Sequence, residues 1–258
     1  MCDVYRFALA IGVWSAAAAK PTPVSEVEAV LIGEKIYVPG GFAADGTPTD
    51  VLEIFDPRQD VWSTGAPLPV PLANYALADY EGLLYLFGGT DGINAKDTVW
   101  IYDPEEDSWQ PGTPMKVARE GAAAVALTDR IVVLGGRNGS RLLKSTLSYV
   151  PSRDASGEDP WEEYVDMPQG RAEFGAASIY DLVYLLGGEI DGEGETGLIL
   201  VEGNWVSLPV ENDYSDSQTQ LLSIGQLLYV LAKPTGMTET EFWAYQAFYY
   251  SIYIPIVP

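Results

Sequence analysis

The sequence predicts an all-β protein made of repeated four-stranded units. Its composition supports this, because 26 glycines, 18 prolines and 16 tyrosines in 258 residues suit many turns and half-buried strands. Four apolar stretches end in Gly-Gly, at Gly40, Gly88, Gly135 and Gly187, with spacings of 48, 47 and 52 residues. Tryptophans recur at nearly the same spacings, at Trp14, Trp62, Trp109, Trp161 and Trp205. Two independent markers that share one period predict an internal repeat.

Each unit opens with two strands that are expected to be buried. The first is moderately apolar, as in GAAAVAL (121–127), and the second is almost continuously apolar until Gly-Gly, as in LLYLFGG (83–89). Continuous apolarity indicates that both faces of the strand are covered. Paired glycines allow positive φ angles or a close backbone approach where that strand ends.

The second half of each unit is expected to form a hairpin. A polar loop such as TDGINAKD (90–97) leads to an aromatic strand, a turn with Pro or Asp, and a strand that carries Trp. An aromatic residue precedes the tryptophan by seven positions in the pairs Phe7–Trp14, Phe55–Trp62 and Tyr102–Trp109. This spacing suits two aromatic side chains on one face of a hairpin. In the third unit the separation from Tyr149 to Trp161 is twelve, which places an insertion in the turn SRDASGED (152–159).

This arrangement resembles the kelch repeat, whose units of about 50 residues form the four-stranded blades of a β-propeller. The resemblance covers nearly the whole chain and implies one propeller domain over residues 1–258. The repeat units are approximately 24–71, 72–118, 119–170, 171–215 and 216–258. Two units depart from the pattern. The fifth has Ala232-Lys233 in place of Gly-Gly and lacks a clear final Trp, and the fourth has a shortened hairpin, LILVEGNW (198–205).

The first 23 residues are predicted to be outer strands of a blade rather than a leader. The run FALAIGVWSAAAA (7–19) looks like the end of a secretory signal, but Val4–Trp14 aligns with Leu52–Trp62 and the preceding MCDVYR has no net positive charge. We therefore expect five blades, with six as the alternative. The ring would be closed by the N- and C-terminal strands in one blade, which ties down both termini and removes an exposed edge. The compartment stays open, with export from a bacterium among the alternatives.

Charge and composition narrow the functional class. With 37 acidic and 14 basic residues the chain has a net charge of −23, which disfavours nucleic acid and anionic membrane surfaces as partners. The chain contains no histidine, so it lacks the most common general base and the usual zinc, copper or iron ligand. Its single cysteine, Cys2, excludes an intrachain disulfide. We expect no cofactor, no metal site, no catalytic residue and no membrane insertion.

Candidate ligand-binding residues lie where the repeat predicts the rim of the central channel. Propellers bind ligands there, on the loops that join strands and blades. Arg119 and Arg171 open two units at equivalent positions, and Arg137 follows a Gly-Gly pair. The other candidates are Asn74, Tyr75, Glu173, Asp91 and Glu189. A guanidinium group suits a carboxylate or sulfate ligand; in the competing interpretation each arginine pairs with a neighbouring carboxylate and stabilises its blade.

Two main functions are compatible with these residues. The first is a non-enzymatic recognition module that binds a protein or peptide through the propeller loops. The alternative is a binder of small molecules or sugar acids, or an enzyme, of the sialic-acid mutarotase type. That resemblance implies arginines that hold a carboxylate, with Glu173 or Glu189 as acid or base, and it requires Arg119 and Arg171 to meet in one pocket. A propeller module of a larger surface protein is a third interpretation.

Overall fold

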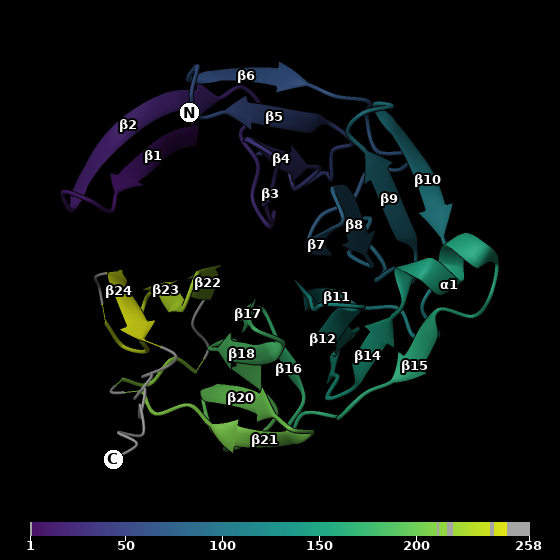
Figure 1. The fold of residues 1–258 in the computed structure, drawn as a ribbon, viewed down its shortest axis with the longest axis vertical. Coiled ribbons are helices and arrows are strands. Elements are labelled where there is room, and N and C mark those ends of the chain that lie inside the picture. Colours follow the sequence, from purple (N-terminus) through teal and green to yellow (C-terminus); the bar gives the residue numbers. More distant parts are fainter. Residues whose placement is uncertain (1, 211, 216–218, 238–239, 247–258) are drawn as a thin grey trace, which may run out of the picture.

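The structure, a computed structural model, describes residues 2–210, 212–215, 219–237 and 240–246. Within these residues, five antiparallel sheets stand around a ring as the blades of a β-propeller (Figure 1). The first strand of each blade lies toward the centre and the last toward the outside. The predicted all-β propeller with five blades is therefore confirmed.

The blades are numbered I to V in chain order. Blade I contains β3 (Val30–Ile32), β4 (Lys35–Pro39), β5 (Leu52–Asp56) and β6 (Val61–Thr64). Blade II contains β7 (Ala76–Tyr80), β8 (Leu83–Phe87), β9 (Val99–Asp103) and β10 (Ser108–Gly112). Blade III contains β11 (Glu120–Ala126), β12 (Ile131–Asn138), β14 (Thr146–Tyr149) and β15 (Trp161–Glu163), with the short β13 (Arg141–Leu142) paired to β12.

Blades IV and V follow in the chain. Blade IV contains β17 (Gly175–Ile179), β18 (Leu182–Leu186), β20 (Gly197–Val201) and β21 (Asn204–Ser207). Blade V contains β22 (Thr219–Ile224), β23 (Leu227–Ala232) and β24 (Glu241–Gln246). Beside blade IV, β16 (Arg171–Ala172) pairs with β19 (Glu189–Ile190).

The Gly-Gly pairs occur where neighbouring blades meet. At the end of β8 the backbone of Gly88 has φ 65°, and a Cβ atom there would lie 2.4 Å from the carbonyl oxygen of Arg119. The next residue, Gly89, donates its backbone N–H to that same oxygen at 2.9 Å. Any side chain at Gly88 would therefore collide with the start of the following unit, which explains why glycine is needed there.

The periodic tryptophans also connect one blade to the next. The indole N–H of Trp109 in β10 donates to the carbonyl oxygen of Ala66 at 2.9 Å, and that of Trp205 in β21 donates to Val165 at 3.0 Å. Each acceptor lies four residues after the tryptophan of the preceding unit. The tryptophan period thus reflects a hydrogen bond between blades as well as the ring stacking within a hairpin.

The insertion predicted in the third unit forms a short helix. It is α1 (Pro151–Ser156), which ends at Gly157 with φ 79°. Asp154 on this helix accepts a hydrogen bond from the backbone N–H of Thr113 at 3.1 Å and one from the hydroxyl of Tyr149. The inserted residues therefore bind the preceding blade. Within the described residues, no helix is long and apolar enough to cross a membrane.

The expected closure of the ring needs one correction. The N-terminal segment forms a hairpin of β1 (Cys2–Ala8) and β2 (Val13–Lys20), but this hairpin is a two-stranded sheet of its own. It contacts blade V through side chains, with ring centroids of Phe7 and Phe242 4.6 Å apart. The two termini do not share one sheet in the described residues because β24 occupies the edge of β23. Residues 247–258, most of the aromatic C-terminal segment predicted to close the ring, lie outside the described residues.

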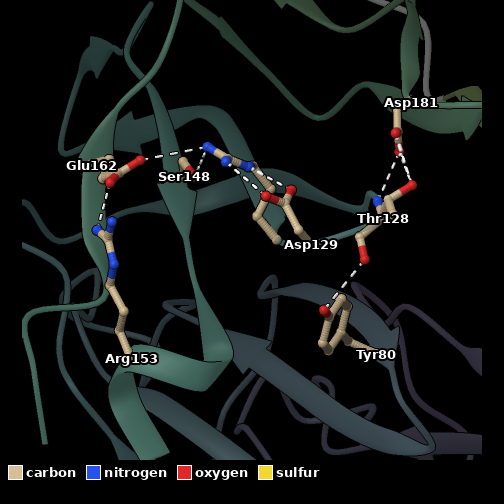
Figure 2. Close-up of polar contacts among 8 residues, drawn as sticks. Tyr80, Thr128, Asp129, Ser148, Arg153, Glu162 and Asp181 are labelled. Atoms are coloured by element: carbon tan, nitrogen blue, oxygen red, sulfur yellow. Dashed lines mark hydrogen bonds and ion pairs between the residues drawn. The ribbon is translucent and has the colours of Figure 1, made fainter. Parts of the chain in front are cut away.

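At the end of the channel away from the Gly-Gly pairs, the turns of three blades contact one another. Figure 2 shows the hydroxyl of Tyr80 donating to the carbonyl oxygen of Thr128 at 3.4 Å, and the backbone N–H of Thr128 donating to Asp181 at 2.7 Å. On the outer side of blade III, Arg153 from α1 reaches Glu162 at 2.5 Å. The hydrogen bonds of Thr128 therefore connect the turns of blades II, III and IV to one another.

Candidate functional site

The Gly-Gly end of the channel carries a belt of residues with left-handed backbone. Glu26, Asn74, Gly121 and Glu173 occupy the same position in four successive units and have φ values of 53°, 53°, 60° and 58°. The backbone N–H of Asn74 donates to Glu26, that of Gly121 to Asn74, and that of Glu173 to Gly121, at 2.8 to 2.9 Å. We call these four residues the mouth belt. Non-glycine residues with positive φ are uncommon and occur often at functional sites.

The side chains of the mouth belt connect to charged residues of the neighbouring loops. The amide of Asn74 donates to Oε1 of Glu173 at 2.7 Å. The Arg137 guanidinium lies 3.6 Å from Oε1 of Glu173 and 3.0 Å from Oε2 of Glu189. The structure therefore brings four of the predicted site residues, Asn74, Arg137, Glu173 and Glu189, into one polar cluster.

Two adjoining cavities lie at this end of the channel. The deeper one, of about 230 Å³, is lined by the mouth belt together with Glu28 and the ring of Tyr75. The outer one, of about 860 Å³, is lined by side chains of blades I to IV, including Phe42, Ile93 and Arg137. We call the outer cavity the mouth hollow. Its lining combines apolar side chains such as Phe42 and Ile93 with charged ones such as Arg137.

The loop from β8 to β9 presents an apolar side chain at the rim of the mouth hollow. Ile93 is 85% exposed. Asp91 accepts hydrogen bonds from the backbone N–H groups of Ile93 and Asn94 at 3.0 and 2.8 Å and forms an ion pair with Lys96. These contacts, led by the hydrogen bond from Lys96, lower the pKa of Asp91 to about 2. The predicted site residue Asp91 therefore shapes the loop that displays Ile93.

Burial changes the ionisation of two glutamates in the deeper cavity. Burial raises the pKa of Glu28 to about 8, although the N–H of Leu77 donates to its carboxylate at 2.9 Å and partly offsets the effect. Burial and the nearby Glu173 also raise the pKa of Glu26. Near neutral pH the cavity thus holds a protonated carboxyl group at Glu28.

Arg119 and Arg171 do not meet in one pocket, which corrects the expectation from the sequence. Each is 1% exposed and lies within its own blade. The guanidinium of Arg119 donates to the carbonyl oxygen of Gly135 at 2.8 Å, and that of Arg171 donates to Gly187 at 2.7 Å. Burial lowers the pKa of each to about 10, so both stay charged at neutral pH. Their acceptors in the described part of the chain are backbone carbonyls and, for Arg119, also the hydroxyl of Ser145, so neither arginine is paired there with a carboxylate as considered above.

Tyr75 is also buried, and its hydroxyl donates to the carbonyl oxygen of Pro39 in blade I. It supports the wall of the deeper cavity.

Sequence analysis did not single out Glu26, Glu28, Phe42 or Ile93. Glu26 could have been found from the repeat, because it precedes Asn74 by 48 residues, the same spacing that separates the Gly-Gly pairs of these units. Among the described residues, no group of three or more acidic or cysteine side chains is arranged to hold a metal ion.

Comparisons with known proteins agree with this architecture. A solved structure titled "Structure of YjhT" superposes with a TM-score of 0.73 and 15% sequence identity, covering 90% of this chain and 84% of that one. At this identity the likeness concerns the fold.

Curated relatives match shorter stretches. Kelch-like protein 35 of Mus musculus is 34% identical over 76 residues, which are 30% of this chain and 13% of that protein. Alpha-scruin of Limulus polyphemus is 36% identical over 59 residues, 23% of this chain and 6% of that protein. The chain thus matches only a small part of the length of these relatives.

The family model described as KLHDC2/KLHL20/DRC7 Kelch-repeats domain matches residues 1–188. With its repeat, its blades and this match, the chain belongs to the kelch-repeat family.

Proposed function

We propose that this chain is a recognition module that binds a protein or peptide segment in the mouth hollow. The observation that supports this proposal most directly is the exposure of Ile93. This apolar side chain is 85% exposed and lies at the rim of a cavity of about 860 Å³. Isolated exposed apolar residues are common on proteins, but here Phe42 lines the same cavity from blade I. An apolar side chain of a partner could pack between them.

The charges of the mouth favour a partner segment with a basic residue. Glu26, Glu120 and Glu173 line the mouth hollow, and its arginine, Arg137, already faces Glu173 and Glu189. The chain as a whole carries a net charge of −23, which accelerates the approach of cationic segments. The preferred ligand would therefore combine one apolar and one basic side chain.

A peptide-display selection tests the proposal. Random peptides are selected on the wild-type chain, and the affinities of enriched peptides are measured for wild type and for Ile93→Asp. The matched control is Val206→Asp, which changes a 44% exposed apolar residue on β21, the outer strand of blade IV. We expect Ile93→Asp to weaken binding by about ten-fold or more, as at an interface hot spot, and Val206→Asp to leave it unchanged. Equal affinities for the two variants would contradict a site at the mouth.

The sugar-acid alternative is tested by measuring the affinity of the same wild-type chain for free sialic acid. Its arginine would have to be Arg137, since Arg119 and Arg171 are buried. Binding of free sialic acid that Arg137→Met abolishes, with no peptide enriched, would favour the alternative over the recognition module.

A further inference from the structure

The loops that follow the Gly-Gly pairs share a dipeptide in which Asp or Asn directly precedes a glycine. The four dipeptides are Asp45-Gly46, Asp91-Gly92, Asn138-Gly139 and Asp191-Gly192. Their glycines have positive φ angles, from 60° to 87°, so glycine suits the turn in each loop. The loop of blade III differs from the other three because its side chain is an uncharged amide rather than a carboxylic acid.

Asn138 lies at the exposed tip of a hairpin. It is the last residue of β12 and pairs with Arg141 in β13. The residue is exposed, and within the described part of the chain its side-chain amide makes no hydrogen bond. The backbone N–H of Gly139 donates no hydrogen bond there either, and a Cβ atom on Gly139 would meet no atom within 4 Å. The side-chain carbonyl carbon and the nitrogen that follows it are therefore both accessible and unengaged.

The other asparagines of the chain lack this combination. Each is followed by a residue with a Cβ atom, which crowds the backbone nitrogen: Tyr75 after Asn74, Ala95 after Asn94, Trp205 after Asn204 and Asp213 after Asn212. Three of the four also donate their side-chain amides to oxygen atoms of glutamate residues. Asn94 is exposed, as Asn138 is, and therefore serves as the internal comparison.

Two of the equivalent aspartates are held in the charged form. The hydroxyl and the N–H of Thr47 donate to the carboxylate of Asp45 at 2.6 and 3.0 Å and lower its pKa. The contacts of Asp91 described above lower its pKa to about 2. An ionised carboxylate resists attack by a backbone nitrogen, because its carbon already shares the negative charge of both oxygens. The neutral amide of Asn138 lacks this protection.

We propose that Asn138 is a site of spontaneous covalent modification, at which the side-chain amide is converted to a carboxylate. Asparagine is among the thermolabile residues of proteins. The backbone nitrogen of Gly139 forms a bond to the side-chain carbonyl carbon and closes a cyclic imide. The bond from that carbon to the side-chain nitrogen breaks, and this nitrogen leaves as ammonia with the proton of the Gly139 N–H. Water then opens the ring at either carbonyl, which leaves an aspartate or an isoaspartate.

The reaction requires the turn to open so that the nitrogen can reach the carbonyl carbon. In the described residues, β13 is joined to β12 by the pairs Arg137–Leu142 and Asn138–Arg141. A connection this short at an exposed tip should open easily. The product adds a negative charge directly after Arg137, whose guanidinium lies at the mouth hollow. The chemistry itself does not depend on partner recognition at the mouth.

Peptide mass mapping of the folded chain during incubation in mildly alkaline buffer tests this assignment. The buffer is made with heavy-oxygen water, so that only amides lost during the incubation take up the label. We expect the peptide with Asn138 to lose ammonia and gain a labelled oxygen, while Asn94 keeps its amide. The matched control is Asn138→Gln, whose longer side chain closes the ring less readily and should stay unmodified. In anion exchange, the aged wild type should move to the position of Asn138→Asp.

The same incubation in urea reports the modification of the unfolded chain. The proposal is overturned if Asn138 keeps its amide in the folded chain; modification in urea would then show that the fold protects it. Equal loss of ammonia at Asn94 and Asn138 in the folded chain would also overturn it, because neither the glycine nor the turn would then matter.

Discussion

Glu28 is a carboxyl residue at a repeat position where the second, third and fourth units have the small residues Ala76, Ala123 and Gly175. Here a carboxyl group accepts a hydrogen bond from Leu77 of the next blade, and burial raises its pKa to about 8. A carboxyl with a raised pKa makes stability depend on pH.

We predict that Glu28→Gln removes part of this pH dependence. In the wild type the folded chain holds the proton up to about pH 8 and the unfolded chain only up to about 4.5. The stabilising effect of the bound proton is complete below pH 4.5 and is lost as pH rises toward 8. Urea unfolding across this range should show a smaller loss of free energy of unfolding for Glu28→Gln. The exposed Glu105→Gln should behave as the wild type, and an identical pH profile for all three proteins would contradict a raised pKa.

At the scale of elements, the hydrogen bonds from the tryptophan side chains explain how the N-terminal hairpin belongs to the ring. Trp62 of β6 donates to the carbonyl oxygen of Ala18 in β2 at 2.8 Å, the same contact that other tryptophans make with the preceding blade. The hairpin is held further by Asp60, which accepts from the N–H of Ala18 at 2.9 Å, and by a buried ion pair between Lys20 and Glu53. It therefore occupies the place of an outer strand pair next to blade I.

We predict that Trp62→Phe lowers the free energy of unfolding by about 1 kcal/mol, the usual net value of one hydrogen bond. Amide hydrogens of β2 should also exchange faster. The matched control is Trp100→Phe, because the buried indole N–H of Trp100 has no partner among the described residues and its loss should cost little. Equal destabilisation by the two substitutions would show that the indole hydrogen bond does not hold the hairpin.

At the scale of the whole molecule, the sequence was sufficient to predict the ring of blades. Gly-Gly and Trp recur because each makes a contact between neighbouring blades, so their period reports the architecture directly. The insertion at α1 was also predictable, since it changes the spacing of two markers. The way in which the ring closes was not predictable from the sequence. It depends on whether β24 or the N-terminal hairpin pairs with the edge of β23, and these two segments lie far apart in the chain.

The site was predictable only in part, for a similar reason. Asn74, Glu173 and Arg137 were identified from their position in the repeat, and they do meet. The same positional argument misplaced Arg119 and Arg171, because it identifies a strand but not the direction of a long side chain. Their orientation is set by backbone carbonyls such as those of Gly135 and Gly187, which no side-chain pattern reveals.

The central claim is that the mouth of the channel is the binding surface, and hydrogen exchange of the chain with a selected peptide tests it most directly. We predict slower exchange in the loops 42–46 and 90–94, which line the mouth hollow. The turns at the opposite end, around Thr128 and Asp181, should be unchanged. Protection confined to those turns or to the outer strands would contradict the account.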